Sequence, residues 1–244
     1  MAIEKHQSIN QHLITRFLLA SGAIGPFLFI VVFLIEGVTR PNYSAWRNFV
    51  SDLSIGQQGW EQICNFLVCG ALMLCFALGL RRVFRSGKAS LWGPILFALF
   101  GLGLIVVGLF VTDPLNGPQT LHGAVHNYVT PLVFILVVAA SFVMARRFAG
   151  DPNWRGWALY SIIAGVLVAV FFVATNLALL LDQNGTLHGA PLGLLQRCAI
   201  IIGWSWIALF ASRLLSITAS SAFMLRNAER EEARSLSQQA KIAE

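Results

Sequence analysis

The sequence predicts an all-α polytopic membrane protein, a six-helix transmembrane bundle built from three helical hairpins. Of its 244 residues, 57% are hydrophobic and only 11% are charged, whereas about 25% are charged in a soluble domain. The mean hydropathy is +0.70. Six apolar runs, each long enough to cross about 30 Å of hydrocarbon as a helix, lie at roughly 17–38, 62–80, 91–112, 127–145, 157–181 and 198–215.

The runs are helices and not barrel strands, because they are long and lack alternation of apolar and polar residues. The first run exceeds a signal-peptide core and has no small-residue cleavage site after it, so we expect it to stay as an anchor. The fourth contains Pro131, which lacks an N–H and should kink the helix. These six spans form a transmembrane domain over residues 1–216, and residues 217–244 form a charge-rich tail, expected to be a solvated helix or a frayed end.

The first outer connection carries a short amphipathic helix. Trp46, Phe49, Val50 and Leu53 follow helical spacing, with Pro41 before them and polar residues opposite. Its polar face would look either toward water or over a pocket as a lid.

The distribution of basic residues predicts the orientation. Of the 17 Lys and Arg residues, only Arg40, Arg47 and Arg197 fall in the first, third and fifth connections. The positive-inside rule therefore predicts a multi-pass protein of the cell inner (plasma) membrane with both termini cytoplasmic. The net charge of +6 is spread over loops, so we expect no nucleic-acid partner.

Polar residues of the spans gather toward the outer side, and a short repeat recurs there. Thr120–Ala124 and Thr186–Ala190 both read Thr-Leu-His-Gly-Ala, after Asp113 and Asp182 respectively. The simplest account is a duplicated helical hairpin, in which His122 and His188 occupy equivalent places; the alternative is coincidence in a Leu- and Gly-rich chain.

These histidines suggest a metal site. His122 and His126 have the i, i+4 spacing that places two imidazoles on one helical face, and His188 could complete a zinc shell. In a zinc-protease motif a Glu that acts as general base follows the first His, whereas Gly123 follows His122 here. The catalytic candidates would therefore be Asp113, Ser51 or Asp52. The alternative is that the histidines only hydrogen-bond to carboxylates and cap helix ends.

A second group of polar residues suits a bound ligand. We predict the ligand-binding residues to be Asn127, Asn176, Asp182, Gln196 and Arg197. Arg197 would contact an anionic headgroup or a neighbouring acid such as Asp182. A disulfide between Cys64 and Cys198 stays open, because both begin inward-running spans.

Several short segments resemble a known family. They are Arg40-Pro41-Asn42-Tyr43-Ser44, Ser51-Asp52-Leu53-Ser54-Ile55-Gly56, Thr112-Asp113-Pro114, the run from His122 to Asn127, and Gly193-Leu194-Leu195-Gln196-Arg197. Over residues 15–215 they resemble the uncharacterised multi-pass membrane family catalogued as domain of unknown function nine-nine-eight. The resemblance implies a six-helix membrane bundle and no known activity. A more distant similarity, to ceramidase-like membrane hydrolases, rests on residue types alone, because the order and number of spans differ.

Three functions follow as hypotheses. The first is a binding protein whose outward His/carboxylate pocket holds a lipid headgroup, small amphiphile or ion. The second is a metal-dependent membrane hydrolase, with zinc as the possible metal, that cleaves an outer-leaflet lipid amide or ester, so whether the chain is an enzyme stays open. The third is an accessory subunit of a larger membrane complex. The partners expected are therefore membrane lipids and, under the third hypothesis, another membrane protein.

Overall fold

The computed structural model describes residues 2–114 and 117–242 and contains six long helices within them, with no strand in these ranges. The helices are α1 (Ala2–Thr39), α2 (Gly59–Val83), α3 (Trp92–Leu109), α4 (Leu121–Phe148), α5 (Trp157–Gln183) and α6 (Leu192–Ile242). Each is long and apolar enough to span a membrane. The prediction of an all-helical, six-span membrane protein is confirmed.

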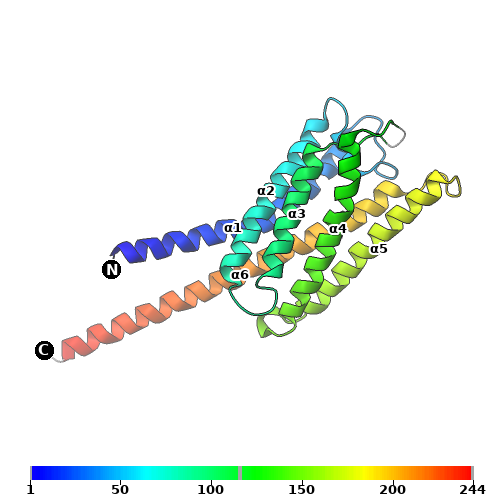
Figure 1. Ribbon diagram of the computed structural model, residues 1–244. Helices are drawn as coiled ribbons and strands as arrows, with labels where there is room; N and C mark the ends of the chain where they lie inside the picture. The colour runs from blue at the N-terminus through cyan, green and yellow to red at the C-terminus, as the bar shows by residue number, and fades with distance from the viewer. Residues whose placement is uncertain (1, 115–116, 243–244) are drawn as a thin grey trace.

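The helices form a closed ring in chain order. Each packs against the next along the chain, and α6 closes the ring against α1. Three connections, α1–α2, α3–α4 and α5–α6, lie at one end of the bundle, which we call the distal end; α1 and α6 extend beyond the bundle at the opposite end, with the two chain termini (Figure 1). The three hairpins therefore share one distal surface.

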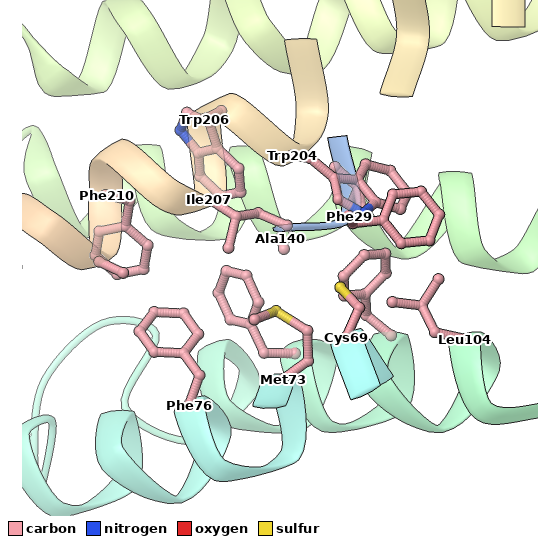
Figure 2. Packing of buried hydrophobic residues seen from close by; sticks show 14 of the residues in the cluster. Phe29, Cys69, Met73, Phe76, Leu104, Ala140, Trp204, Trp206, Ile207 and Phe210 are labelled. Atoms are coloured by element: carbon pink, nitrogen blue, oxygen red, sulfur yellow. The ribbon is translucent and has the colours of Figure 1, made fainter. Parts of the chain in front are cut away.

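Aromatic side chains fill the centre of the ring. Trp204 of α6 lies with its ring centroid 5.0 Å from Phe100 of α3 and 5.7 Å from Phe29 of α1. Further along α6, the rings of Trp206 and Phe210 stack with their centroids 6.0 Å apart and pack toward α2 and α3 (Figure 2). Trp206 Nε1 donates to Ser161 Oγ at 2.9 Å, which satisfies its one polar atom.

Small residues let α2 and α3 approach closely. A Cβ at Gly101 would lie 2.7 Å from the carbonyl oxygen of Gly70, which is closer than real Cβ atoms come to other atoms. Gly101 thus sets the spacing of these two helices, as small residues do at helix contacts in membranes.

Several helices extend beyond the apolar runs from which they were predicted. The fourth helix begins at Leu121 and not near 127, because Thr120 Oγ1 accepts from the Gly123 N–H at 3.1 Å and caps the helix before the apolar run begins. The predicted tail continues α6 as helix to Ile242; its residues 243–244 lie outside the described part of the chain.

The helix predicted in the first connection is shorter than its apolar spacing indicates. It is a 3₁₀ helix, η1 (Val50–Ser54), in which Ser51 and Ser54 are buried along with Val50 and Leu53. Ser51 and Ser54 are covered because η1, within the 40–58 loop, contacts α1, α2 and α6.

Candidate functional site

A cavity of about 560 Å³ opens at the distal end between α4, α5 and α6, beneath the 40–58 loop. The ribbons of α4 and α5 diverge toward this end (Figure 1), and side chains from both helices line the space between them. Its polar lining comprises Ser51, Asp52, Thr112, Asp113, Gln119, His126, Asn127, Thr130, Thr175, Asn176, Gln183 and Gln196. Its aromatic lining comprises Phe49, Phe134 and Phe172.

Asp52 and Ser51 cover one side of this cavity from η1. Asp52 Oδ2 accepts from the Phe49 N–H at 3.0 Å and from Asn48 Nδ2 at 3.3 Å, which closes the turn before the 3₁₀ helix. Burial raises the pKa of Asp52, and these two hydrogen bonds and nearby Arg197 oppose the rise. Its second oxygen, Oδ1, accepts no hydrogen bond from the described residues, and Asp52 belongs to the cavity lining.

Gln196 fixes that loop to α6. Its Oε1 accepts from the Val50 N–H at 2.7 Å, and the residue is 9% exposed. Its Nε2 makes no hydrogen bond to the described residues and belongs to the cavity lining. The predicted ligand-binding residue Gln196 thus both holds the loop and presents one donor to the cavity.

Arg197 lies beside the cavity and does not line it. It is 6% exposed, and its Nη1 donates at 2.9 Å to each of the carbonyls of Ala45, Asn48 and Gly193. Its Nη2 donates to the hydroxyl of Tyr43, whose pKa burial raises to about 12. The guanidinium holds the 40–58 loop onto α6, and both of its terminal nitrogens donate to protein acceptors.

The two other arginines of the distal end also hold this loop. Arg47 forms a bidentate pair with Asp182, at 2.9 and 3.0 Å, which raises the pKa of Arg47. Asp182 also accepts from the Gly189 and Ala190 N–H groups and does not line the cavity. Arg40 donates to the carbonyls of Ile55 and Gln58. The sequence suggested Asp182 as a partner for Arg197, whereas its partner is Arg47.

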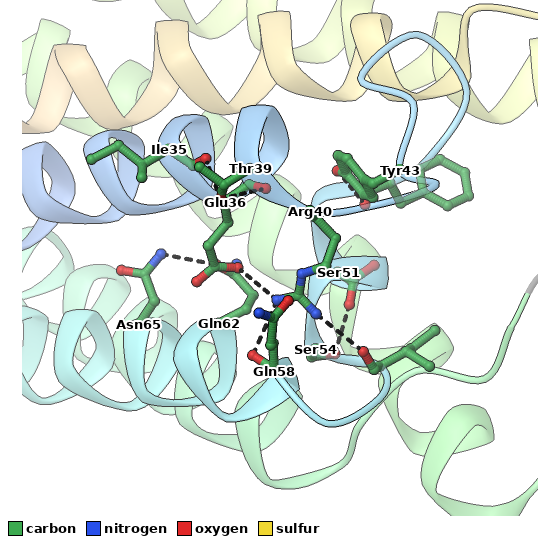
Figure 3. Close-up of polar contacts among 12 residues, drawn as sticks. Ile35, Glu36, Thr39, Arg40, Tyr43, Ser51, Ser54, Gln58, Gln62 and Asn65 are labelled. Carbon is green, nitrogen blue, oxygen red and sulfur yellow. Dashed lines mark hydrogen bonds and ion pairs between the residues drawn. The ribbon is translucent and has the colours of Figure 1, made fainter.

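Arg40 also neutralises a buried acid outside the cavity. Glu36 is 4% exposed and lies 3.6 Å from Arg40 Nη2, beside Gln62 and Asn65 of α2 (Figure 3). Asn65 Nδ2 donates to the Gln62 Oε1 and to the Phe29 carbonyl, which ties α2 to α1. This cluster stabilises the contact of α1 with α2 and contributes nothing to the cavity lining.

Asp113 stands at the opposite side of the cavity, before α4. Its Oδ2 accepts from the Thr120 N–H at 2.7 Å and its Oδ1 from the Thr120 hydroxyl at 2.8 Å. A Cβ at Gly123 would collide with this carboxylate, so the glycine of the first Thr-Leu-His-Gly-Ala segment is required by close contact. Asp113 therefore shapes the start of α4 and lines the cavity at once.

Of the three histidines predicted as metal ligands, only His126 lines the cavity. Its Nδ1 lies 2.8 Å from the Phe110 carbonyl and 3.1 Å from that of Val107. His122 is exposed with its ring against Phe110, and His188 is exposed in the α5–α6 connection. Within residues 2–114 and 117–242, no group of three His, Cys, Asp or Glu side chains lies close enough to hold a metal ion.

The two copies of the repeated segment adopt different conformations. In the first, Thr120 caps α4 and His122 lies in its first turn. In the second, Thr186 and Leu187 donate to the Leu181 carbonyl in a turn after α5, and α6 begins only at Leu192. His122 and His188 are therefore not structurally equivalent, because the same five residues cap a helix in one connection and end one in the other.

Asn127 of α4 and Asn176 of α5 both line the cavity. Each is exposed, and each lies about two turns from the distal end of its helix. Pro131 provides no N–H for the carbonyl of Asn127, as the sequence indicates. Because both asparagines are exposed and line the cavity, it opens between the two helices, at a depth that the helices also span, as well as toward the distal connections.

Several lining residues were not predicted from the sequence. Thr130 and Thr175 donate their hydroxyls to the carbonyls one turn earlier, of His126 and Phe171, and Gln119 and Gln183 lie at the rim. The available signal was that each of these threonines lies close in sequence to an asparagine within an otherwise apolar run: Thr130 three positions after Asn127, and Thr175 directly before Asn176.

The disulfide that the sequence left open is not formed, because Cys64 and Cys198 are both free thiols.

Comparison with known proteins identifies the chain at the level of its family. A family model described as "Protein of unknown function (DUF998)" matches residues 23–213, which contain the cavity and most of all six spans. No curated protein matches the chain, and no solved structure matches it. Since the family model covers well over half of the sequence, the chain belongs to the DUF998 family.

Proposed function

We propose that this protein binds the headgroup of a membrane amphiphile in the distal cavity, with the tail of the amphiphile passing between α4 and α5 into the bilayer. The single observation that carries the proposal is the position of the cavity mouth. Asn127 and Asn176 line it from two apolar, membrane-spanning helices. A polar space that opens sideways at this level suits a molecule that is polar at one end and apolar at the other.

The lining supports this division. Phe134 of α4 and Phe172 of α5 line the cavity deeper along their helices than Asn127 and Asn176 do. The rings of Phe134 and Phe172 stack at 5.0 Å. A smaller apolar extension, lined by Phe29, Leu104 and Trp204 among others, adjoins the same space through His126 and Gln196. A headgroup would thus find hydrogen-bond partners near the distal end, and a tail that runs deeper would meet the aromatic rings of both helices.

The location follows from charge. Nearly all Lys and Arg residues lie away from the distal end, so the positive-inside rule favours a distal end on the outer face of the inner (plasma) membrane and both termini in the cytoplasm. The ligand would then come from the outer leaflet. The metal-dependent hydrolase gains no comparable support, because His122, His126 and His188 do not converge on one point.

The test is a cavity-filling variant. Thr130→Phe places an aromatic ring in the cavity, and Thr39→Phe is a matched control at an exposed position near the distal end of α1. Each protein would be purified in a mild detergent, and the amphiphile that remains bound would be quantified by native mass spectrometry. We expect the wild type and Thr39→Phe to retain a near-stoichiometric ligand that Thr130→Phe loses. Equal retention by all three proteins would contradict the proposal.

A further inference from the structure

We propose that the headgroup bound in the distal cavity is a protonated amine. This inference rests on the proposed function and adds the chemical class of the ligand. Among the described residues that line the cavity, none is Lys or Arg, whereas Asp52 and Asp113 both belong to the lining. A space with two carboxylates and no cation favours a positively charged group and repels a phosphate or sulfate.

The arginines that could have balanced these carboxylates are occupied elsewhere. Arg47 is paired with Asp182, and Arg197 donates to three backbone carbonyls and to Tyr43. Arg40 donates to two carbonyls and faces Glu36. All three lie outside the cavity lining. The positive charges of the distal end therefore hold the loop in place, and none of them lines the cavity beside the two carboxylates.

His126 adds an acceptor at the buried end of the cavity. The residue is 3% exposed, and its Nδ1 lies within hydrogen-bond distance of two backbone carbonyls, of Val107 and Phe110. Because a carbonyl only accepts, Nδ1 carries the proton and Nε2 of the neutral ring presents a lone pair. Nε2 makes no hydrogen bond to the described residues. A residue that lines the cavity therefore carries an acceptor with no partner among the described residues.

Three other lining residues each donate a hydrogen bond to a backbone carbonyl of their own helix. The hydroxyls of Thr130 and Thr175 donate to carbonyls at 2.8 and 2.7 Å, and Asn176 Nδ2 donates to the Phe172 carbonyl at 2.8 Å. The two threonines therefore offer a ligand only oxygen lone pairs, and Asn176 offers its Oδ1 together with one remaining N–H. Together with the free Asp52 Oδ1, they form a surface rich in acceptors, and an ammonium group with three N–H donors satisfies it better than a polyanion does.

The test compares three single-chain probes that share a twelve-carbon tail: dodecylammonium, dodecyl sulfate and dodecyl maltoside. Binding to the full protein in phosphatidylcholine nanodiscs would be measured by thermophoresis, with empty nanodiscs as the reference. We expect the Kd for dodecylammonium to be at least about tenfold lower than for the other two probes.

Charge variants at the rim make the test independent of folding. Gln119 is exposed, lines the cavity, and its side chain makes no hydrogen bond to the described residues. Gln119→Lys should weaken dodecylammonium binding by about tenfold, and Gln119→Glu should strengthen it by a similar factor. Asp113→Asn should weaken it as well. Glu61→Gln, which removes a carboxylate of α2 outside the cavity lining, should leave the Kd unchanged.

The outcomes separate the two proposals. If dodecyl sulfate or dodecyl maltoside binds as tightly as dodecylammonium and the Gln119 variants do not change the Kd, the amine headgroup is wrong while amphiphile binding stands. If no probe binds beyond the empty nanodiscs, both proposals fail.

Discussion

Replacing Arg197 by methionine should destabilise the protein by about 3–5 kcal/mol. Arg197 is 6% exposed and donates to three carbonyls at 2.9 Å, two of them in the 40–58 loop. A hydrogen bond to a charged group contributes roughly 1.5–3 kcal/mol, and losing one partner of a buried charged network costs about 3–5 kcal/mol in total, because such contributions do not add. Arg197→Lys keeps the charge without the planar fork and should cost about half as much.

The assay is unfolding in mixed micelles by titration with sodium dodecyl sulfate, followed by circular dichroism. Arg213→Met is the control, since Arg213 is exposed and makes one hydrogen bond, to the Asn153 carbonyl at 3.0 Å. Its loss should cost no more than about 1 kcal/mol. Limited proteolysis should cut the 40–58 loop faster in Arg197→Met than in the control. An equal free energy of unfolding for Arg197→Met and Arg213→Met would refute the role given to Arg197.

Three further predictions concern packing and charge. Gly101→Ala should destabilise the α2–α3 contact by about 1–3 kcal/mol in the same titration, because its Cβ would lie 2.7 Å from the Gly70 carbonyl, whereas Gly150→Ala, with nothing within 4 Å, should stay within about 0.5 kcal/mol. Gly123→Ala should displace the Asp113 carboxylate and speed amide exchange in the first turn of α4; unchanged exchange would argue against that contact. Because the pKa of Asp52 is raised, its carboxyl group stays protonated to higher pH in the native state than in the unfolded chain. The contribution of this group to the free energy of unfolding should therefore fall as the pH rises from 3.8, its usual pKa, through the raised pKa. Asp52→Asn should abolish that part of the pH dependence of the melting temperature, and the same slope in both proteins would count against a buried carboxylate.

The membrane architecture could be predicted from the sequence because long uncharged runs leave a chain in lipid few alternatives. Six spans and an all-helical bundle follow from apolar length and from the need to satisfy backbone hydrogen bonds within each segment. The start of α4 was missed because the helix continues beyond the apolar run to a threonine cap, which hydropathy does not register. Capping chemistry thus fixes where a membrane helix begins.

The polar residues were harder to place, because their partners depend on loops that fold back onto the bundle. Gln196, Asn127 and Asn176 line the cavity together, and they share a predicted depth along their helices. Asp182 and Arg197 were expected beside them, yet each is engaged by the 40–58 loop, through Arg47 in one case and backbone carbonyls in the other. Such contacts join residues more than 130 positions apart, and spacing along the chain carries no information about them.

The histidines illustrate a different limit. The i, i+4 spacing placed His122 and His126 on one face of α4, but the carbonyls at the end of α3 engage His126 while His122 stays exposed against Phe110. The spacing also said nothing about His188, whose position depends on how the α5–α6 connection turns. Helical periodicity predicts which residues share a face and not which helix that face meets.

The most direct test of the central claim is to locate a bound amphiphile on the chain. The protein in nanodiscs would be irradiated with dodecylammonium that carries a diazirine in its tail, and the labelled peptides mapped by mass spectrometry. Binding in the distal cavity predicts adducts on residues 127–134 of α4 and 172–179 of α5 that excess unlabelled dodecylammonium suppresses. Adducts spread over the exposed faces of α1 and α2, with no suppression by competitor, would contradict it.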